Sequence, residues 1–294
     1  MHRRKIVLIS GSGRTGSTLL SLLLSQHKDV FNLGQLRDLP EAWGQDAPCT
    51  CGHTLTTCPV WSEVGPKVDL GLLGDLQANF FAEARRHPDW AARGAIKSLS
   101  DNHRAYIAAL ANLLDAIQAA TVATTFIDAS KSPEMARALS LTQGTDARVL
   151  NLVRDPRAVA VSWRERRGRL SAAWKFSRDW AWRQGMLQRW SSALGERFRV
   201  LRYEDFAAAP KKTVDDILKW AGLPAAPRLF TAPDQAKLSW AGQHLYPPAN
   251  ERVLAEKATA VTIRPSEGWR AERHGLTRWL AMLAAGAEGR RYVG

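Results

Sequence analysis

Long apolar runs are missing from this chain of 294 residues. A membrane-spanning helix needs about 18 or more consecutive apolar residues, and the nearest candidate, 108–126, is interrupted by Asn112, Asp115 and Gln118. The apolar stretch after the basic residues at the chain start is too short for a secretory signal. We therefore expect a cytoplasmic protein with no membrane partner.

Cysteine is also scarce, and its three occurrences, Cys49, Cys51 and Cys58, lie within ten residues with His53 between them. So few cysteines in so long a chain exclude a fold that depends on a disulfide framework. The group has the residue types of a Cys3His zinc site, but Cys-x-Cys is not the usual ligand spacing. A disulfide within the short loop and plain reduced thiols are the alternatives. A cytoplasmic chain favours reduced thiols, and we expect no required metal.

The composition is that of a globular protein with an excess of positive charge. Apolar residues make up 45% of the chain, and no repeat or linker divides it, so we predict a single domain over 1–294. Lysine and arginine number 41 against 28 acidic residues, a net charge of +13, which attracts nucleic acid, acidic membranes or small polyanions. Six arginines fall within sixteen residues: Arg154, Arg157, Arg164, Arg166, Arg167 and Arg169. This clustering indicates an anion site or a basic helix face, although a solvated basic surface is the alternative.

Strand and helix patterns alternate along the chain. Apolar or β-branched runs predict strands at Lys5–Ser10, Thr124–Asp128, Arg148–Val153 and Arg197–Leu201. Helical patterns occupy Ser17–Leu24 and Pro210–Ala221, and cap residues followed by proline begin helices at Ser132-Pro133 and Asp155-Pro156. The segment 36–66 is expected to be loop, and 75–120 helical with a break near Pro88 and Gly94. This alternation predicts an α/β fold, a three-layer α/β/α sandwich around a mostly parallel sheet.

A glycine loop follows the first expected strand. Gly11-x4-Gly16-Ser17-Thr18, between a strand and a helix, is typical of a phosphate-binding loop. The lysine that reaches the β- and γ-phosphates of a nucleoside triphosphate is replaced by Ser17, and a cation appears earlier, as Arg14. This shift argues against ATP or GTP hydrolysis and suits a ligand whose reacting group lies beyond one 5′-phosphate. A glycine turn without a ligand is the alternative.

At this loop the chain resembles the sulfotransferases that use 3′-phosphoadenosine 5′-phosphosulfate (PAPS), in their bacterial form. The resemblance continues in order along nearly the whole sequence. It is carried by these segments: Gly13-Arg14-Thr15-Gly16-Ser17-Thr18, Asp128-Ala-Ser-Lys131-Ser-Pro133, Val153-Arg154-Asp155-Pro156-Arg157 with Ser162, Tyr203-Glu204-Asp205, His244 with Asn250 and Arg252, Ile263-Arg264-Pro265, Gly268-Trp269-Arg270 and Tyr292. The cysteine loop, with Cys58-Pro-Val-Trp61, is similar to an insert of that group.

The resemblance implies roles for individual residues. The donor PAPS, with 3′-phosphoadenosine 5′-phosphate (PAP) as product, is expected to contact Gly13, Arg14, Thr15, Gly16, Ser17, Thr18, Arg154, Ser162, Tyr203 and Arg264. Arg14 and Lys131 would be the catalytic cations, which flank the transferred group without a metal. The family's usual glutamate base is replaced by Gln35, which cannot accept a proton at neutral pH. Asp38, His53 and Asp128 are positional candidates for a base, although each has a structural alternative.

The expected reaction is in-line transfer of a sulfuryl group to a hydroxyl of a sugar, aryl or natural-product acceptor. We expect the segment 36–120 to shape the acceptor pocket. Twelve tryptophans offer either stacking surfaces or core packing. The alternatives are a phosphate-loop nucleotide kinase and a non-catalytic polyanion- or nucleotide-binding protein. Because the cations gather at the loop, Lys131 and the Arg154 helix, we expect no nucleic-acid partner.

Overall fold

A five-stranded parallel sheet lies at the centre of the computed structural model, which describes residues 4–87, 99–223, 225–246 and 256–293. The strand order is β2-β3-β1-β4-β5, and every neighbouring pair is parallel. The strands are β1 (Arg4–Gly11), β2 (Val30–Gly34), β3 (Thr125–Asp128), β4 (Thr145–Val153) and β5 (Phe198–Arg202). The α/β class, the parallel sheet and the loop after the first strand are therefore confirmed.

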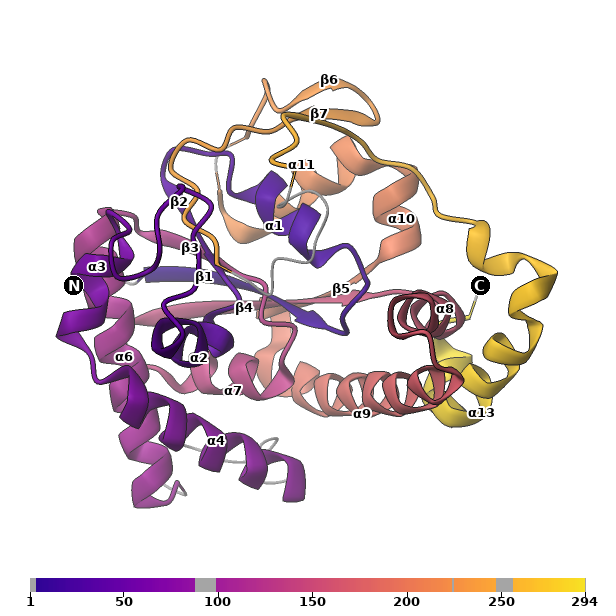
Figure 1. Cartoon of the computed structure of the whole chain (residues 1–294), viewed down its shortest axis with the longest axis horizontal. Helices are drawn as coiled ribbons and strands as arrows, with labels where there is room; N and C mark the ends of the chain where they lie inside the picture. Colours follow the sequence, from indigo (N-terminus) through magenta and orange to yellow (C-terminus); the bar gives the residue numbers. More distant parts are fainter. Residues whose placement is uncertain (1–3, 88–98, 224, 247–255, 294) are drawn as a thin grey trace.

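Helices cover both faces of the sheet (Figure 1). One face carries α1 (Ser17–Leu24), α10 (Tyr203–Ala208) and α11 (Pro210–Ala221). The other face carries α2 (Leu39–Gly44), α3 (Trp61–Val64), α4 (Leu70–Arg86), α6 (Asp101–Thr121), α7 (Pro133–Leu141) and α9 (Leu170–Leu194). The helices α8 (Pro156–Arg167) and α13 (Gly275–Arg291) pack against α9 and against each other. Among the described helices, none has both the length and the apolar character needed for a membrane span.

The side chains of β1 show why this strand lies in the middle of the sheet. Ile6 and Leu8 enter the core on the side of α6 and α7, whereas Val7 and Ile9 enter the core on the side of α1 and α11. All four are fully buried. A strand covered on both faces needs a continuous apolar run, which is the pattern that predicted it.

The sequence patterns did not predict β2 or a second, smaller sheet. β2 is short and interrupted by Asn32, whose side-chain amide is buried and donates hydrogen bonds to the hydroxyls of Ser21 on α1 and of Ser25 just after it. A small antiparallel sheet forms from β6 (Phe230–Ala232), β7 (Gln235–Lys237) and β8 (Ala260–Thr262). The expected loop at 36–66 also includes short helical turns at Leu36–Asp38 and Gly65–Lys67 besides α2 and α3. The break expected near Pro88 and Gly94 lies outside the described residues.

The end of β1 depends on glycine at position 11. Gly11 has a φ of +123°, and a Cβ there would lie 2.4 Å from the backbone oxygen of Leu152 on β4. Both the left-handed backbone and the contact with the neighbouring strand therefore exclude a side chain.

We expect Gly11→Ala to lower the free energy of unfolding by about 2–3 kcal/mol, because the added methyl group forces the two strands apart. Urea unfolding measures the change. Gly185→Ala is the matched control, since Gly185 lies within α9 with open space around it, and this change should be neutral or stabilise by up to about 1 kcal/mol. Equal stability of Gly11→Ala and the unaltered protein would contradict the argument.

Candidate functional site

The loop after β1 opens at the carboxyl end of the sheet, where α1 begins. Gly16 caps α1 with a left-handed backbone, φ 83°, and no side chain caps the helix. Thr15 is buried and braces the loop by donating from its hydroxyl to the backbone oxygen of Ser12 at 2.9 Å. The N–H groups of the first helical turn thus face the space that an anion would occupy.

Two residues from the region of β4 and α8 hold this loop. Arg154 follows β4, and its Nη1 donates to the backbone oxygen of Arg14 at 2.9 Å. The Nε of Arg14 donates to the hydroxyl of Ser162, on α8, at 2.9 Å. The guanidinium of Arg154 also lies over the ring of Tyr203, 4.3 Å from its centre. The loop after β1, the segment that contains Arg154 and Ser162, and Tyr203 therefore lie next to one another.

A pocket with a volume of about 160 Å³ lies where these segments meet. Its lining contains seven of the ten residues expected to contact a donor: Arg14, Gly16, Ser17, Thr18, Arg154, Ser162 and Tyr203. Gly13 lines the neighbouring pocket instead, and Thr15 acts as the brace described above. Arg264 is not among the described residues that line either pocket. It is exposed and pairs with Asp234 at 3.5 Å.

A second pocket, with a volume of about 220 Å³, adjoins the first. It is lined by Ser12, Gly13, Arg14, Gln35, Arg37, Lys131, Trp163, Arg166, Phe176, Asp179 and Arg183. Arg14 lines both pockets. The lining comes from the loop after β1, the ends of β2 and β3, and the helices α8 and α9. Arg37 is the residue of the segment 36–120 that belongs to this lining.

Lys131 and Gln35 meet in the second pocket. The ammonium of Lys131 donates to Oε1 of Gln35 at 3.0 Å, and the backbone N–H of Lys131 donates to Ile9 on β1 at 3.1 Å. Lys131 and Arg14 both have left-handed backbones, with φ of 57° and 69°. Such conformations cost non-glycine residues free energy and gather at functional sites. Here they fix the starting direction of the two cations expected to act in catalysis.

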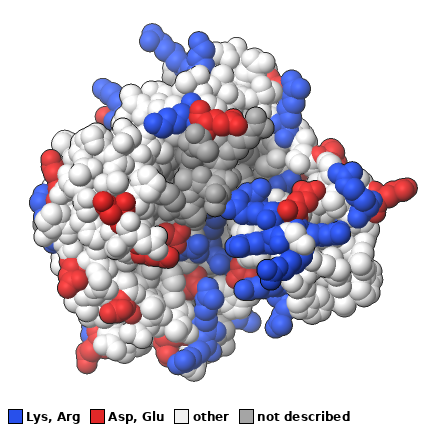
Figure 2. All heavy atoms as spheres, in the orientation of Figure 1, with Lys and Arg blue, Asp and Glu red and all other residues white. Residues whose placement is uncertain are grey.

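Positive charge gathers on the same face of the molecule. Figure 2 shows lysine and arginine side chains beside the central hollow, over α8, while the acidic side chains are scattered. The last turn of α8 carries Arg164, Arg166 and Arg167, and cations at this end also favour the helix dipole. The arginines that cluster in the sequence therefore form a positively charged surface beside the two pockets.

A model described as the sulfotransferase family matches residues 7–227, more than half of the chain. The chain belongs to the sulfotransferase family. Its structure is similar to the sulfotransferase domain of the olefin synthase from Synechococcus PCC 7002, with a TM-score of 0.52 and 20% identity over 97% of this chain and 96% of that one. A sulfotransferase from Mycobacterium avium gives a TM-score of 0.45 and 19% identity over 77% and 65%. The first likeness shows the fold, and no curated protein matches the chain.

The three carboxylate or imidazole groups suggested as a base lie elsewhere in this sulfotransferase. Asp128 is fully buried and accepts hydrogen bonds from the N–H groups of Leu36 and Ser130 and from the Ser130 hydroxyl. Asp38 pairs with Arg37, and His53 is exposed in the cysteine loop. None of the three is among the described residues that line the second pocket. Of those residues, Asp179 on α9 has the sole carboxylate, and no sequence motif had singled it out.

The tryptophans divide between the site and the core. Trp163 and Phe176 stack with ring centres 3.8 Å apart and an angle of 8°, and both line the second pocket. Trp180 and Trp61 are almost completely buried. Trp163 therefore lies in the second pocket, while Trp61 and Trp180 contribute to core packing.

The cysteine loop also differs from its expected arrangement. Cys49, Cys51 and Cys58 lie together without a disulfide, but their histidine neighbour is His244 and not His53. His244 comes from a segment nearly two hundred residues further along the chain, so spacing alone could not find it.

Asp128 makes the stability of this sulfotransferase depend on pH. Burial raises the pKa of Asp128 from 3.8 to about 6, against the hydrogen bonds from Ser130 and Leu36. Between these two values the folded state keeps a proton that the unfolded state loses, so the contribution of Asp128 to stability falls as the pH rises. Below pH 3.8 the carboxyl group is protonated in both states, and above about pH 6 it has lost its proton in both, so the stability no longer changes with pH through Asp128.

We therefore expect Asp128→Asn to gain stability relative to the unaltered protein between pH 4 and pH 7, by on the order of 2 kcal/mol. Urea unfolding at a series of pH values gives this difference. Asp29→Asn, at an exposed carboxylate, is the control and should show no such trend. A constant offset between Asp128→Asn and the unaltered protein at all pH values would contradict the assignment.

Proposed function

We propose that this sulfotransferase takes its sulfuryl group from PAPS and transfers it to a hydroxyl of a small-molecule or saccharide acceptor. The observation that carries the proposal is the position of Arg14, which lines both pockets and is held by Ser162 and Arg154. A transferred group has to reach both donor and acceptor, and the shared wall between two pockets is where it would do so. The family resemblance in the loop and at Arg154 points to the same donor.

The first pocket has the chemistry of a site for two phosphates. The helix N-terminus and loop N–H groups suit a 5′-phosphate, and Arg154 with Ser162 suits a 3′-phosphate. Burial lowers the pKa of Arg154, because its charge is partly removed from water. A phosphate beside this guanidinium would restore the lost solvation, and the ring of Tyr203 under it suits an adjacent nucleoside.

The proposed transfer is an in-line displacement. The acceptor oxygen forms a bond to sulfur while the bond between sulfur and the 5′-phosphate oxygen breaks, and the electron pair of that bond leaves with the phosphate. Arg14 and Lys131 would stabilise the charge on the departing oxygen and on the sulfuryl group. Gln35, which accepts a hydrogen bond from Lys131, would orient this ammonium and not remove a proton.

Asp179 would accept the proton of the acceptor hydroxyl. Its carboxylate lines the second pocket and accepts a hydrogen bond from Arg183 at 2.7 Å, which fixes its orientation. The stacked rings of Trp163 and Phe176 would provide a flat wall for a sugar or aryl ring. The additional cations Arg37, Arg166 and Arg183 in the lining favour an acceptor that itself carries a negative charge.

The alternatives make different demands on the same site. A nucleotide kinase needs a cation at the β- and γ-phosphates, where this chain has Ser17. A nucleic-acid-binding protein needs an extended basic surface with stacking aromatics, whereas Arg154 is partly buried in a pocket of about 160 Å³. The unbridged cysteines agree with the cytoplasmic location that we still expect.

Binding of PAP tests the donor site without an acceptor. In calorimetric titrations without magnesium, PAP should bind, and Arg154→Ala should weaken it on the order of 10²-fold, because charge-assisted hydrogen bonds to phosphate are lost. Arg154→Lys should give an intermediate loss, since a lysine keeps the charge but not the two-pronged contact.

Two further variants and one ligand serve as controls for this titration. Arg104→Ala, at an exposed arginine on α6 that pairs with Asp101, should bind PAP normally, and the placement of Arg264 predicts the same for Arg264→Ala. ATP with magnesium should bind far more weakly than PAP. The donor proposal fails if PAP does not bind, and a preference for ATP with magnesium would support the kinase.

The role of Asp179 can be separated from substrate binding by the acidity of the acceptor. With PAPS and a panel of alcohols, sugars and phenols, Asp179→Asn should reduce the rate by about 10²–10⁴ for weakly acidic hydroxyls. An acidic phenol such as 4-nitrophenol, which ionises readily, should show a much smaller reduction. PAP affinity should remain unchanged.

The control for this series is Asp215→Asn, at an exposed carboxylate on α11 that pairs with Lys211, and it should leave all rates unchanged. Gln35→Glu tests the other position at which a base is expected. Equal reductions for all acceptors in Asp179→Asn would assign Asp179 a structural role and would rule out proton transfer to it.

A further inference from the structure

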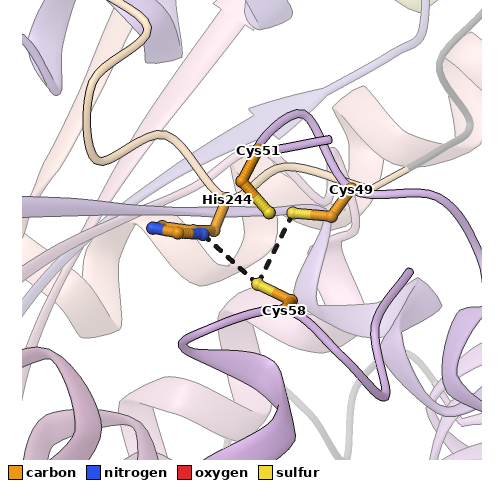
Figure 3. A group of neighbouring side chains, drawn as sticks. All are labelled: Cys49, Cys51, Cys58 and His244. Atoms are coloured by element: carbon orange, nitrogen blue, oxygen red, sulfur yellow. Dashed lines mark hydrogen bonds between the residues drawn. The ribbon is translucent and has the colours of Figure 1, made fainter. Parts of the chain in front are cut away.

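Three thiols and one imidazole converge between the cysteine loop and the segment after β7, and none of them lines either pocket. Figure 3 shows Cys49, Cys51, Cys58 and His244 pointing toward a common centre. Their sulfur atoms and one ring nitrogen of His244 all lie within 4.8 Å of one another. Cys49 and Cys58 are buried, and the other two are partly buried. So dense a group of soft ligands is unusual in a chain with only three cysteines.

The distances between these atoms agree with a tetrahedral metal site. The Sγ atoms of Cys49 and Cys58 are 3.7 Å apart, and Cys58 Sγ lies 3.2 Å from Nδ1 of His244. Zinc binds cysteine sulfur at about 2.3 Å and histidine nitrogen at about 2.0–2.1 Å. A tetrahedron with these bond lengths has edges of roughly 3.8 Å between sulfurs and about 3.6 Å between sulfur and nitrogen. The other distances between these atoms are at most 4.8 Å, so modest side-chain adjustments would complete the tetrahedron around a bound ion.

The local backbone explains how a Cys-x-Cys pair can serve one ion. Pro48 and Thr54 form an antiparallel bridge, and the N–H of Cys49 donates to the backbone oxygen of His53 at 2.7 Å. Gly52, with a φ of +100°, allows the chain to reverse between them. The narrow turn brings Cys49 and Cys51 to the same side, while His53 remains exposed. The unusual spacing is therefore compatible with two adjacent ligands.

Backbone N–H groups favour the thiolate form of all three cysteines. Burial raises the pKa of Cys58, while the N–H groups of Trp61 and Val60 hydrogen-bond to its sulfur and act in the opposite direction. Burial also raises the pKa of Cys49, against a hydrogen bond from the N–H of Cys51, whereas the pKa of Cys51 is lowered despite its partial burial by a hydrogen bond from the N–H of His53. Such hydrogen bonds stabilise thiolates, the form in which cysteine binds metals.

We infer that Cys49, Cys51, Cys58 and His244 together bind one zinc ion in a closed tetrahedral site. Four protein ligands leave no position for water or substrate, so the ion stabilises structure and takes no part in catalysis. The zinc site that the sequence left open as an alternative is therefore preferred to plain reduced thiols, and the expectation that the transfer itself requires no metal stays a prediction. It does not depend on the donor or acceptor proposed above.

The ion would join two segments that are far apart in the sequence. Hydrogen bonds near the ion site also join these two segments. The N–H of Thr50 donates to the backbone oxygen of Leu245 at 2.8 Å, and the indole of Trp61 donates to the backbone oxygen of His244 at 2.7 Å. Tyr246, two residues after the histidine, donates its hydroxyl to the backbone oxygen of Gln35 at 3.2 Å. A metal at His244 therefore restrains a segment that contacts the wall of the second pocket.

Zinc content of the purified protein tests the inference directly. We expect about one zinc per chain by elemental analysis after dialysis, and its release when a mercurial reagent modifies the thiols. Cys58→Ser and His244→Ala should each reduce the zinc content at least tenfold. His53→Ala is the matched control, because it removes the other histidine of the loop region and should retain the full zinc content.

Two further measurements cover the case in which a ligand variant does not fold. Exchange of the unaltered protein with Co²⁺ should give the absorption bands of a tetrahedral thiolate site, and a strong chelator should lower its Tm by several degrees. The inference is overturned if the folded protein contains less than a tenth of a zinc ion and its three thiols react freely with a thiol reagent. A disulfide between two of the cysteines in protein purified without reductant, or full zinc retention in His244→Ala, would also overturn it.

Discussion

One hydrogen bond, from the guanidinium of Arg154 to the backbone oxygen of Arg14, connects the two chain segments that line the first pocket. Its geometry follows from the sheet. β1 and β4 pair in parallel over their full length, with Gly11 opposite Leu152, so the residues that leave the two strands emerge side by side. Because parallel neighbours end at the same edge, the loop after one strand and the arginine after the other meet without any long-range adjustment.

The other side of the site is positioned in the same way by β2 and β3. Asp128 ends β3, and its carboxyl oxygen holds the N–H of Leu36 just after β2. The neighbouring backbone N–H of Arg37 donates to the hydroxyl of Ser130. These buried contacts set the separation between Gln35 and Lys131, whose side chains then meet in the second pocket. A buried carboxyl group that does not line the second pocket thus positions two residues that do.

Sequence patterns predicted the parts of this protein that depend on local signals. The bounds of α1 and α11 agree with the periodicity, and the cap residues Ser132 and Asp155 begin α7 and α8 as expected. The loop and its arginine carried the family resemblance because phosphate chemistry constrains short stretches of chain. β2 escaped notice because its buried Asn32 interrupts the apolar run, and the side-chain amide of Asn32 is satisfied by Ser21 and Ser25, at the end of α1.

Residues that act through tertiary placement escaped notice for a related reason. Asp179 lies in the middle of α9, where an acidic residue on a long helix normally faces solvent, and only the packing of α8 against α9 gives it a pocket to line. His244 reaches the cysteines from a remote segment. For Arg264 the sequence motif resembles that of the family, but the side chain pairs with Asp234 and is not among the described residues that line either pocket.

The shared position of Arg14 has a consequence for how the two pockets respond to their occupants. A guanidinium that lines both has one orientation at a time, so a ligand that fixes it in one pocket changes the free energy of filling the other. Thermodynamic linkage requires this effect to be reciprocal and equal in both directions. The affinity of either pocket for its ligand is therefore not a constant of the protein but a function of what occupies the other pocket.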